Sequence, residues 1–157
     1  RVGRSAGLAL YPEVYTLCGV TQAILQSSRT DTPPPTKEAP MGKLTTHVLD
    51  TMNGCPAAGM AARLYRMDGA APQLLKQLQL NHDGRADQPL LADAALLPGR
   101  YRLVFSVLPY FRGRGVALPE PAFLDEVPLD FGIADTSLHY HVPLLASPWS
   151  YSTYRGS

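Results

Sequence analysis

The chain has 157 residues, a length typical of one globular domain. Its 14 Lys and Arg residues nearly balance its 13 Asp and Glu residues, and a net charge of +1 gives no reason to expect a nucleic acid as partner. A hydrophobic fraction of 45% argues against disorder of the whole chain. No apolar run reaches the roughly 18 residues of a membrane span, so no membrane partner is expected.

Residues 1–40 differ in composition from the rest of the chain. Their apolar stretch at 6–11 is shorter than the core of a secretory signal, although a weak targeting peptide is left as an alternative. The polar, proline-rich run at 27–35 is typical of an extended linker. We therefore expect 1–40 to be a poorly ordered tail that is dispensable, and 41–157 to be the folded domain. The cytoplasm is the expected compartment, with the periplasm and the peroxisome left open.

Short β-favouring segments recur between turn signals in this domain, in keeping with 15 Pro and 13 Gly in the chain. Six of the seven or eight expected strands lie at 44–50, 59–67, 74–80, 100–108, 127–134 and 138–145. A turn is expected at 81–85, and one short helix at either 110–117 or 122–126. Seven or eight short strands predict an all-β fold, a two-sheet antiparallel β-sandwich with one short helix.

The last expected strand is the most informative segment for function. Apolar residues alternate from Leu138 to Leu144, and if they face the core, His139 and His141 point to the opposite face. His47 in the first strand is a further candidate. From spacing alone, all three histidines also fit ordinary surface or structural positions.

Other kinds of catalytic site find little support. His47, His139 and His141 together would resemble a three-histidine zinc site, but no histidine or carboxylate motif of helical spacing accompanies them. The sequence has no G-x-S-x-G nucleophile motif. Cys18 and Cys55 have no metal-ligand spacing, and Cys55 has no sequence neighbour that would activate its thiol. No metal is therefore expected.

Both ends of the predicted domain carry recognisable motifs. LTTHVLD at 44–50, followed by GCPA at 54–57, resembles the amino-terminal signature of the transthyretin-related 5-hydroxyisourate hydrolases. HVPLL at 141–145 and YSTYRGS at 151–157 resemble the carboxy-terminal signatures of that family. Transthyretin itself shares the fold but lacks the terminal Tyr-Arg-Gly-Ser. The resemblance therefore favours the enzyme over the hormone carrier.

The resemblance implies a transthyretin-like sandwich that forms a homotetramer, with active sites in a channel where dimers meet. It implies hydrolysis of 5-hydroxyisourate to 2-oxo-4-hydroxy-4-carboxy-5-ureidoimidazoline in urate catabolism, without metal or cofactor. Carried over by motif, the catalytic residues are His47, Arg85, His141 and Ser157, and the substrate-binding residues are His47, Arg85 and Tyr154. In the family motif Ser157 closes the chain, so both its hydroxyl and a free carboxylate are expected at the site.

These residue types suit the implied reaction. Imidazole titrates near neutral pH, so His47 and His141 can serve as base and acid. Which of them is the base stays open, with a preference for His47. Arg85 offers fixed donors to a planar substrate that gains negative charge. The alternative is a non-catalytic carrier of a small hydrophobic ligand, for which these polar side chains would be a poor lining.

Overall fold

The computed structural model describes residues 42–156, so the predicted tail 1–40 and Ser157 lie outside the described residues. In chain order the elements are β1 (Lys43–Thr45), β2 (Val48–Asp50), β3 (Cys55–Pro56), β4 (Ala61–Arg66), β5 (Gln73–Gln79), β6 (Leu91–Ala92), a 3₁₀ turn (Asp93–Ala95), β7 (Gly99–Ser106), α1 (Val107–Gly113), β8 (Glu126–Ile133), β9 (Tyr140–His141), β10 (Leu144–Ala146) and β11 (Tyr151–Ser152). None of the helices in 42–156 is long and apolar enough to cross a membrane.

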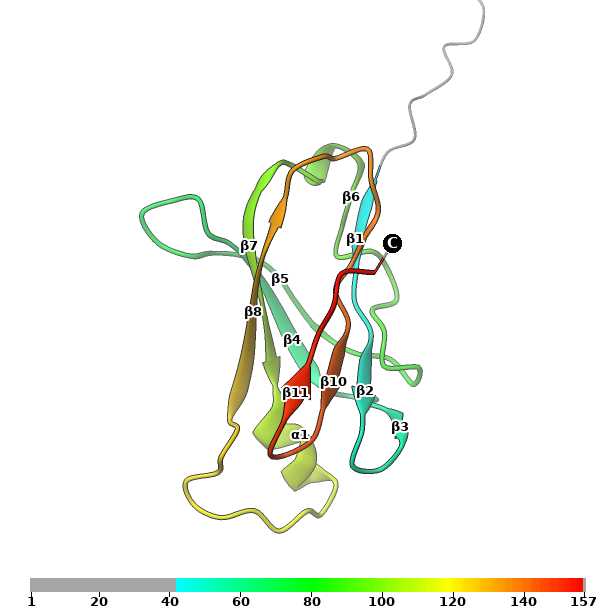
Figure 1. Ribbon diagram of the computed structural model, residues 1–157, viewed down its shortest axis with the longest axis vertical. Coiled ribbons are helices and arrows are strands. Elements are labelled where there is room, and N and C mark those ends of the chain that lie inside the picture. Colours follow the sequence, from blue (N-terminus) through cyan, green and yellow to red (C-terminus); the bar gives the residue numbers. More distant parts are fainter. Residues whose placement is uncertain (1–41, 157) are drawn as a thin grey trace, which may run out of the picture. The chain divides into compact units, whose positions relative to one another are not determined.

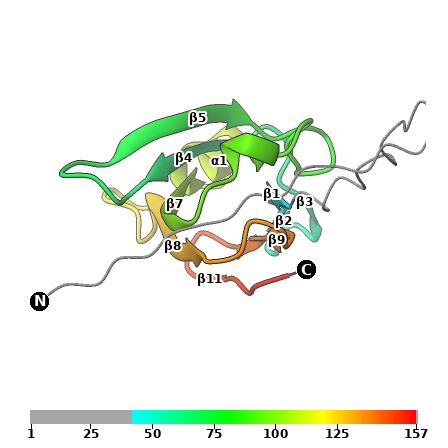
Figure 2. The same ribbon diagram turned by 90° about the horizontal axis from the view of Figure 1, so that it is seen from above.

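The strands form two layers, which are seen edge-on in Figure 2. One layer is the antiparallel sheet β5-β4-β7-β8, in which Leu103 pairs with Leu64 on one side and Leu129 on the other. The second layer contains the sheets β6-β1-β9 and β11-β10-β2-β3, with β1 and β2 following each other along the chain (Figure 1). The predicted all-β sandwich with a single short α-helix is confirmed.

The second layer departs from the predicted geometry in two respects. β1 pairs with β9, and β2 with β10, in parallel, whereas a wholly antiparallel sandwich was expected. The strands expected at 44–50 and 138–145 are each divided in two. Pro143 has no N–H to continue the ladder, and the carbonyl of Val142 accepts the Thr46 hydroxyl at 2.7 Å. This break in the second layer lies where His47 and His141 are placed.

The core between the layers consists of alternate residues of the long strands together with one face of the helix. Tyr101, Leu103 and Phe105 are buried, as the period of two predicted. Leu138 is 44% exposed, so its predicted core position is wrong. The reason is that β9 begins only at Tyr140, and Leu138 therefore lies in the preceding turn.

The helix begins earlier than the sequence predicted. Its buried residues Val107 and Phe111 are separated by four positions, which places both on the core face of α1. Pro109 falls in the first helical turn, where a missing N–H costs no intrahelical hydrogen bond. The strand expected at 100–108 consequently ends at Ser106. The helix is anchored by the Tyr110 hydroxyl, which donates to the buried Asp50 carboxylate at 3.0 Å.

Candidate active site

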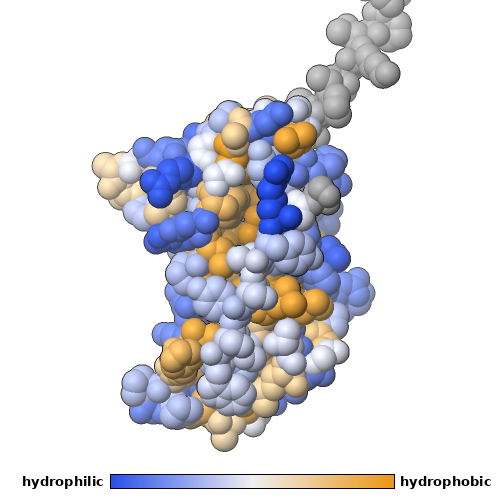
Figure 3. Space-filling model, in the orientation of Figure 1, coloured by the Kyte–Doolittle hydropathy of each residue, from blue (hydrophilic) through white to orange (hydrophobic). Residues whose placement is uncertain are grey.

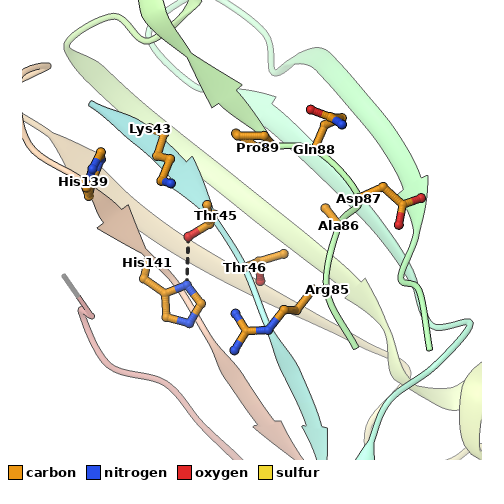
Figure 4. Close-up of a pocket in the computed structure, with 10 residues that line it drawn as sticks. All are labelled: Lys43, Thr45, Thr46, Arg85, Ala86, Asp87, Gln88, Pro89, His139 and His141. Atoms are coloured by element: carbon orange, nitrogen blue, oxygen red, sulfur yellow. Dashed lines mark hydrogen bonds between the residues drawn. The ribbon is translucent and has the colours of Figure 1, made fainter. Parts of the chain in front are cut away.

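A polar pocket of about 610 Å³ opens on the second layer (Figure 4). It is lined by Lys43, Thr45 and Thr46, by the segment 85–89, and by His139 and His141. Three regions far apart in the sequence thus contribute side chains to one cavity. Two of the predicted site residues, Arg85 and His141, lie together in it.

Arg85 is held in place by a compact turn after β5. The amide of Asn81 donates to the Arg85 carbonyl at 2.8 Å, and the Asn81 side-chain oxygen accepts the amides of Asp83 and Arg85 at 3.0 and 3.1 Å. Gly84 adopts a φ of +68°, and its carbonyl accepts the amide of Val48 at 2.9 Å. The turn predicted from composition is confirmed, and it directs an exposed Arg85 towards the pocket. Among residues 42–156, no carboxylate pairs with this guanidinium.

His141 is held from two sides. Its Nδ1 lies 2.9 Å from the hydroxyl of Thr45, the residue that faces it in the parallel pairing of β1 and β9. On the other side, the backbone of Gly156 pairs with that of His141 through bonds of 2.9 and 3.2 Å. A Cβ atom on Gly156 would lie 3.0 Å from the His141 ring, so the small size of glycine allows this close approach. The ring is therefore fixed with one edge towards Arg85 (Figure 4).

His47 lies next to this pocket rather than in its lining. It forms an isolated antiparallel bridge with Arg85. Its carbonyl accepts the amide of Leu144, so it also contacts the segment that follows His141. The structure therefore brings His47, Arg85 and His141 to one region of the second layer.

Burial and the positive charge of Arg85 favour neutral imidazoles in this region. Burial, and then the positive charge of Arg85, lower the pKa of His47, while a backbone hydrogen bond and the charge of Asp83 act in the opposite direction. Burial lowers the pKa of His141 as well, followed by the charges of Arg85 and His47. At neutral pH both rings consequently retain an unprotonated nitrogen, as a proton acceptor requires.

These shifts predict a loss of stability on acidification. Both histidines have folded-state pKa values below the ordinary 6.5, so the unfolded chain takes up protons first as the pH falls. We expect the free energy of unfolding to be unaffected by these groups well above pH 6.5 and to decrease below it. Denaturant unfolding between about pH 8 and pH 5 measures this. A His47→Gln, His141→Gln double variant should show a shallower decrease, and an unchanged pH dependence would contradict the prediction.

Tyr154 does not line the polar pocket. It is 60% exposed and belongs to a second pocket of about 400 Å³ between β8 and the segment that contains β9 and β11. The neighbouring Arg155 lies over the ring of Tyr140, with its guanidinium carbon 4.9 Å from the ring centroid. Ser157 lies outside the described residues. Within a single chain, therefore, the structure assembles the histidine and arginine residues but not Tyr154.

Sequence reasoning missed two residues that organise the site. Thr45 stands inside the LTTHVLD motif, two positions before His47, and could have been identified from its place on the same side of an extended strand. Asn81 was recognised in the sequence only as part of the turn expected at 81–85, and its role in holding Arg85 was not. In 42–156, no group of three or more His, Cys, Asp or Glu side chains is arranged to hold a metal ion.

Comparison with known proteins agrees with this geometry. The model of the HIUase/Transthyretin family matches residues 44–156. A 5-hydroxyisourate hydrolase of Pseudomonas aeruginosa is 59% identical over 118 residues, which are 75% of this chain and 94% of that protein. Among solved structures, the 5-hydroxyisourate hydrolase of Klebsiella pneumoniae is 33% identical with a TM-score of 0.62, covering 74% of this chain and 100% of that one.

A second solved structure, (S)-allantoin synthase, is 44% identical with a TM-score of 0.72. The match covers 76% of this chain but only 45% of the synthase chain, so the synthase contains much that has no counterpart here. The motifs at both ends of the domain, the two-layer fold and the family match lead to the same assignment. The chain belongs to the HIUase/Transthyretin family.

Proposed function

We propose that this protein hydrolyses 5-hydroxyisourate, with His47, Arg85 and His141 as its catalytic residues. The observation that carries the proposal is that a guanidinium with no carboxylate partner among residues 42–156 shares a polar pocket with a neutral imidazole, and that a second neutral imidazole lies beside them. The names of close relatives give the substrate. The geometry supplies the groups that such a hydrolysis needs.

The reaction requires a proton acceptor, an anion stabiliser and a proton donor. A water molecule loses a proton to an imidazole as its oxygen bonds to a ring carbonyl carbon of the substrate. The resulting oxyanion collapses, the carbon–nitrogen bond breaks, and the ring nitrogen leaves with a proton returned by an imidazolium. The new carboxyl group accounts for the water consumed. No step calls on a metal or an organic cofactor.

Arg85 is suited to the oxyanion. Its guanidinium keeps its charge at any working pH and presents several donors in one plane, matching a planar heterocycle that becomes more negative. Burial, and after it the same charge, lower the pKa of both histidines. Arg85 is thus suited to stabilise the negative charge that forms in the reaction, and it also contributes to the lowered pKa values of the two histidines.

We further propose a homotetramer in which residues from neighbouring chains complete the site. In the described residues, β8 and β11 are the last strands of their sheets, with one edge unpaired. Trp149, Tyr151 and Tyr154 are exposed near β11, and apolar surface runs along this face between polar patches (Figure 3). Open edges with aromatic side chains favour pairing with another copy. In such an assembly Tyr154 would bind substrate in a neighbouring chain's site.

Ser157 is proposed as the fourth catalytic residue. It directly follows Gly156, whose backbone pairs with that of His141. If its hydroxyl binds substrate or the attacking water, Ser157→Ala should lower kcat by about tenfold, the equivalent of one lost hydrogen bond. Steady-state kinetics measure this, with thermal unfolding to show that the fold is retained. A kcat equal to that of the parent protein would remove Ser157 from the catalytic set.

The carrier alternative can be tested by isotopic labelling. Protein in large excess over 5-hydroxyisourate is mixed in ¹⁸O-water, and the products are analysed by mass spectrometry at times too short for spontaneous decay. Hydrolysis predicts rapid appearance of a product with one ¹⁸O in its new carboxyl group. A carrier would leave the substrate unlabelled and intact over the same interval.

A further inference from the structure

The His141 ring lies within hydrogen-bond distance of a threonine hydroxyl that none of the family motifs marks as functional. Thr45 Oγ1 lies 2.9 Å from His141 Nδ1, and in the described residues this is the hydrogen bond formed by the Thr45 side chain. The two residues are directly opposite each other in the parallel pairing of β1 and β9. Strand register therefore fixes this contact, and it does not depend on a mobile loop.

The surroundings of the other ring nitrogen determine which one carries the proton. In Figure 4 the ring edge with Nε2 faces the guanidinium of Arg85. The arginine side chain has only hydrogen-bond donors. A proton on Nε2 would therefore place an N–H donor of His141 opposite the N–H donors of the guanidinium. A hydroxyl can either donate or accept, and Thr45 can therefore accept a proton that lies on Nδ1. The arrangement therefore favours the tautomer in which Nδ1 is protonated and Nε2 is not.

We propose that Thr45 is a positioning residue, which accepts the Nδ1–H of His141 and so keeps the Nε2 lone pair directed into the pocket. This inference rests on the proposed hydrolysis and assigns His141 as the group that takes the proton from water. When Nε2 accepts that proton, the ring becomes an imidazolium with donors on both nitrogens. Thr45 can accept from Nδ1 in both states, so the ring need not turn during the reaction.

The opposite side of the ring is restrained by Gly156, on which a Cβ atom would lie only 3.0 Å from the ring. Thr45 and Gly156 together hold the imidazole in one orientation, one by a hydrogen bond and the other by contact. Contact alone does not choose between the two tautomers. That choice falls to the two polar neighbours together, the guanidinium of Arg85 facing Nε2 and the Thr45 hydroxyl at Nδ1.

The test is Thr45→Val, which keeps the β-branched shape of the side chain and removes only the hydroxyl. We expect kcat to fall by about tenfold, as for one lost hydrogen bond, with a smaller change in KM. Thr45→Ser restores a hydroxyl and should recover most of the rate. Thr51→Val is the matched control, because it removes a threonine hydroxyl that donates to the carbonyl of Ala146 away from the pocket.

Long-range ¹H–¹⁵N NMR of the histidine rings provides a measure that does not depend on activity. At a pH where His141 is neutral, the parent protein and Thr45→Ser should show the Nδ1–H tautomer. Thr45→Val should show a mixture or the Nε2–H form. A parent protein with the Nε2–H tautomer, or a Thr45→Val variant with unchanged tautomer and kcat, would overturn the proposal. A protein inactive on 5-hydroxyisourate with the expected tautomers would overturn the proposed function instead.

Discussion

Replacement of His141 by alanine is expected to lower kcat/KM by about 10²–10⁴-fold, the usual loss when a general acid or base is removed. The ring is only partly buried and contributes one side of a polar pocket, so the two-layer core should remain intact. Arg85→Ala should cause a loss of about 10²–10³-fold, as removal of an oxyanion donor does. Initial rates with 5-hydroxyisourate, together with thermal unfolding, separate a lost catalytic group from a lost fold.

The matched control for His141→Ala is His82→Ala. His82 is largely exposed and pairs with Asp83, outside the pocket. Its removal should leave kcat/KM close to the parent value. A variant that combines His47→Ala, Arg85→Ala and His141→Ala should lose far less than the product of the three single effects, because residues that act as a unit are not additive. Near-normal turnover of either His141→Ala or Arg85→Ala would remove that residue from the mechanism.

Gly84→Ala is expected to cause a large loss of stability in the turn that carries Arg85. Gly84 has a φ of +68°, and a Cβ atom there would lie 2.4 Å from the backbone carbonyl oxygen of Val48. Because that neighbour is backbone, the turn itself must move. We expect the free energy of unfolding to fall by about 2 kcal/mol or more, from backbone strain and steric overlap together. Displacement of the following Arg85 should also lower kcat.

Gly54→Ala separates these two contributions. Gly54 has nearly the same φ, +66°, but nothing lies within 4 Å of its added Cβ. In the Gly54→Ala variant the free energy of unfolding should therefore fall by only about 1 kcal/mol, because of the left-handed backbone, and the activity should be kept. Denaturant unfolding of both variants gives the comparison. Equal losses for Gly84→Ala and Gly54→Ala would show that the close approach of Gly84 to Val48 has no energetic importance.

The long strands of the sandwich were predictable because their periodicity is local. Tyr101, Leu103 and Phe105 alternate along one strand, and their burial follows from that pattern alone. The end of the same strand was not predictable. Val107 continues the alternation, but it also starts the apolar face of α1, and only tertiary packing decides between the two.

The site was predictable in its members but not in its arrangement. The family motifs give His47, Arg85 and His141, yet no local pattern shows that β1 and β9 pair in parallel or that Thr45 faces His141. Such register is set by pairing between segments almost a hundred residues apart. The role of Gly156 depends on the same kind of tertiary contact, because its small size allows a close approach to His141.

To measure hydrolysis by this protein, 5-hydroxyisourate is generated in place from urate and urate oxidase, the protein is added, and the decay of the substrate's ultraviolet absorbance is followed. We predict a decay rate that rises in proportion to the concentration of the parent protein. With equal amounts of Arg85→Ala, the rate should return almost to that of spontaneous decay. Decay no faster with the parent protein than in buffer alone would show that the protein does not hydrolyse 5-hydroxyisourate.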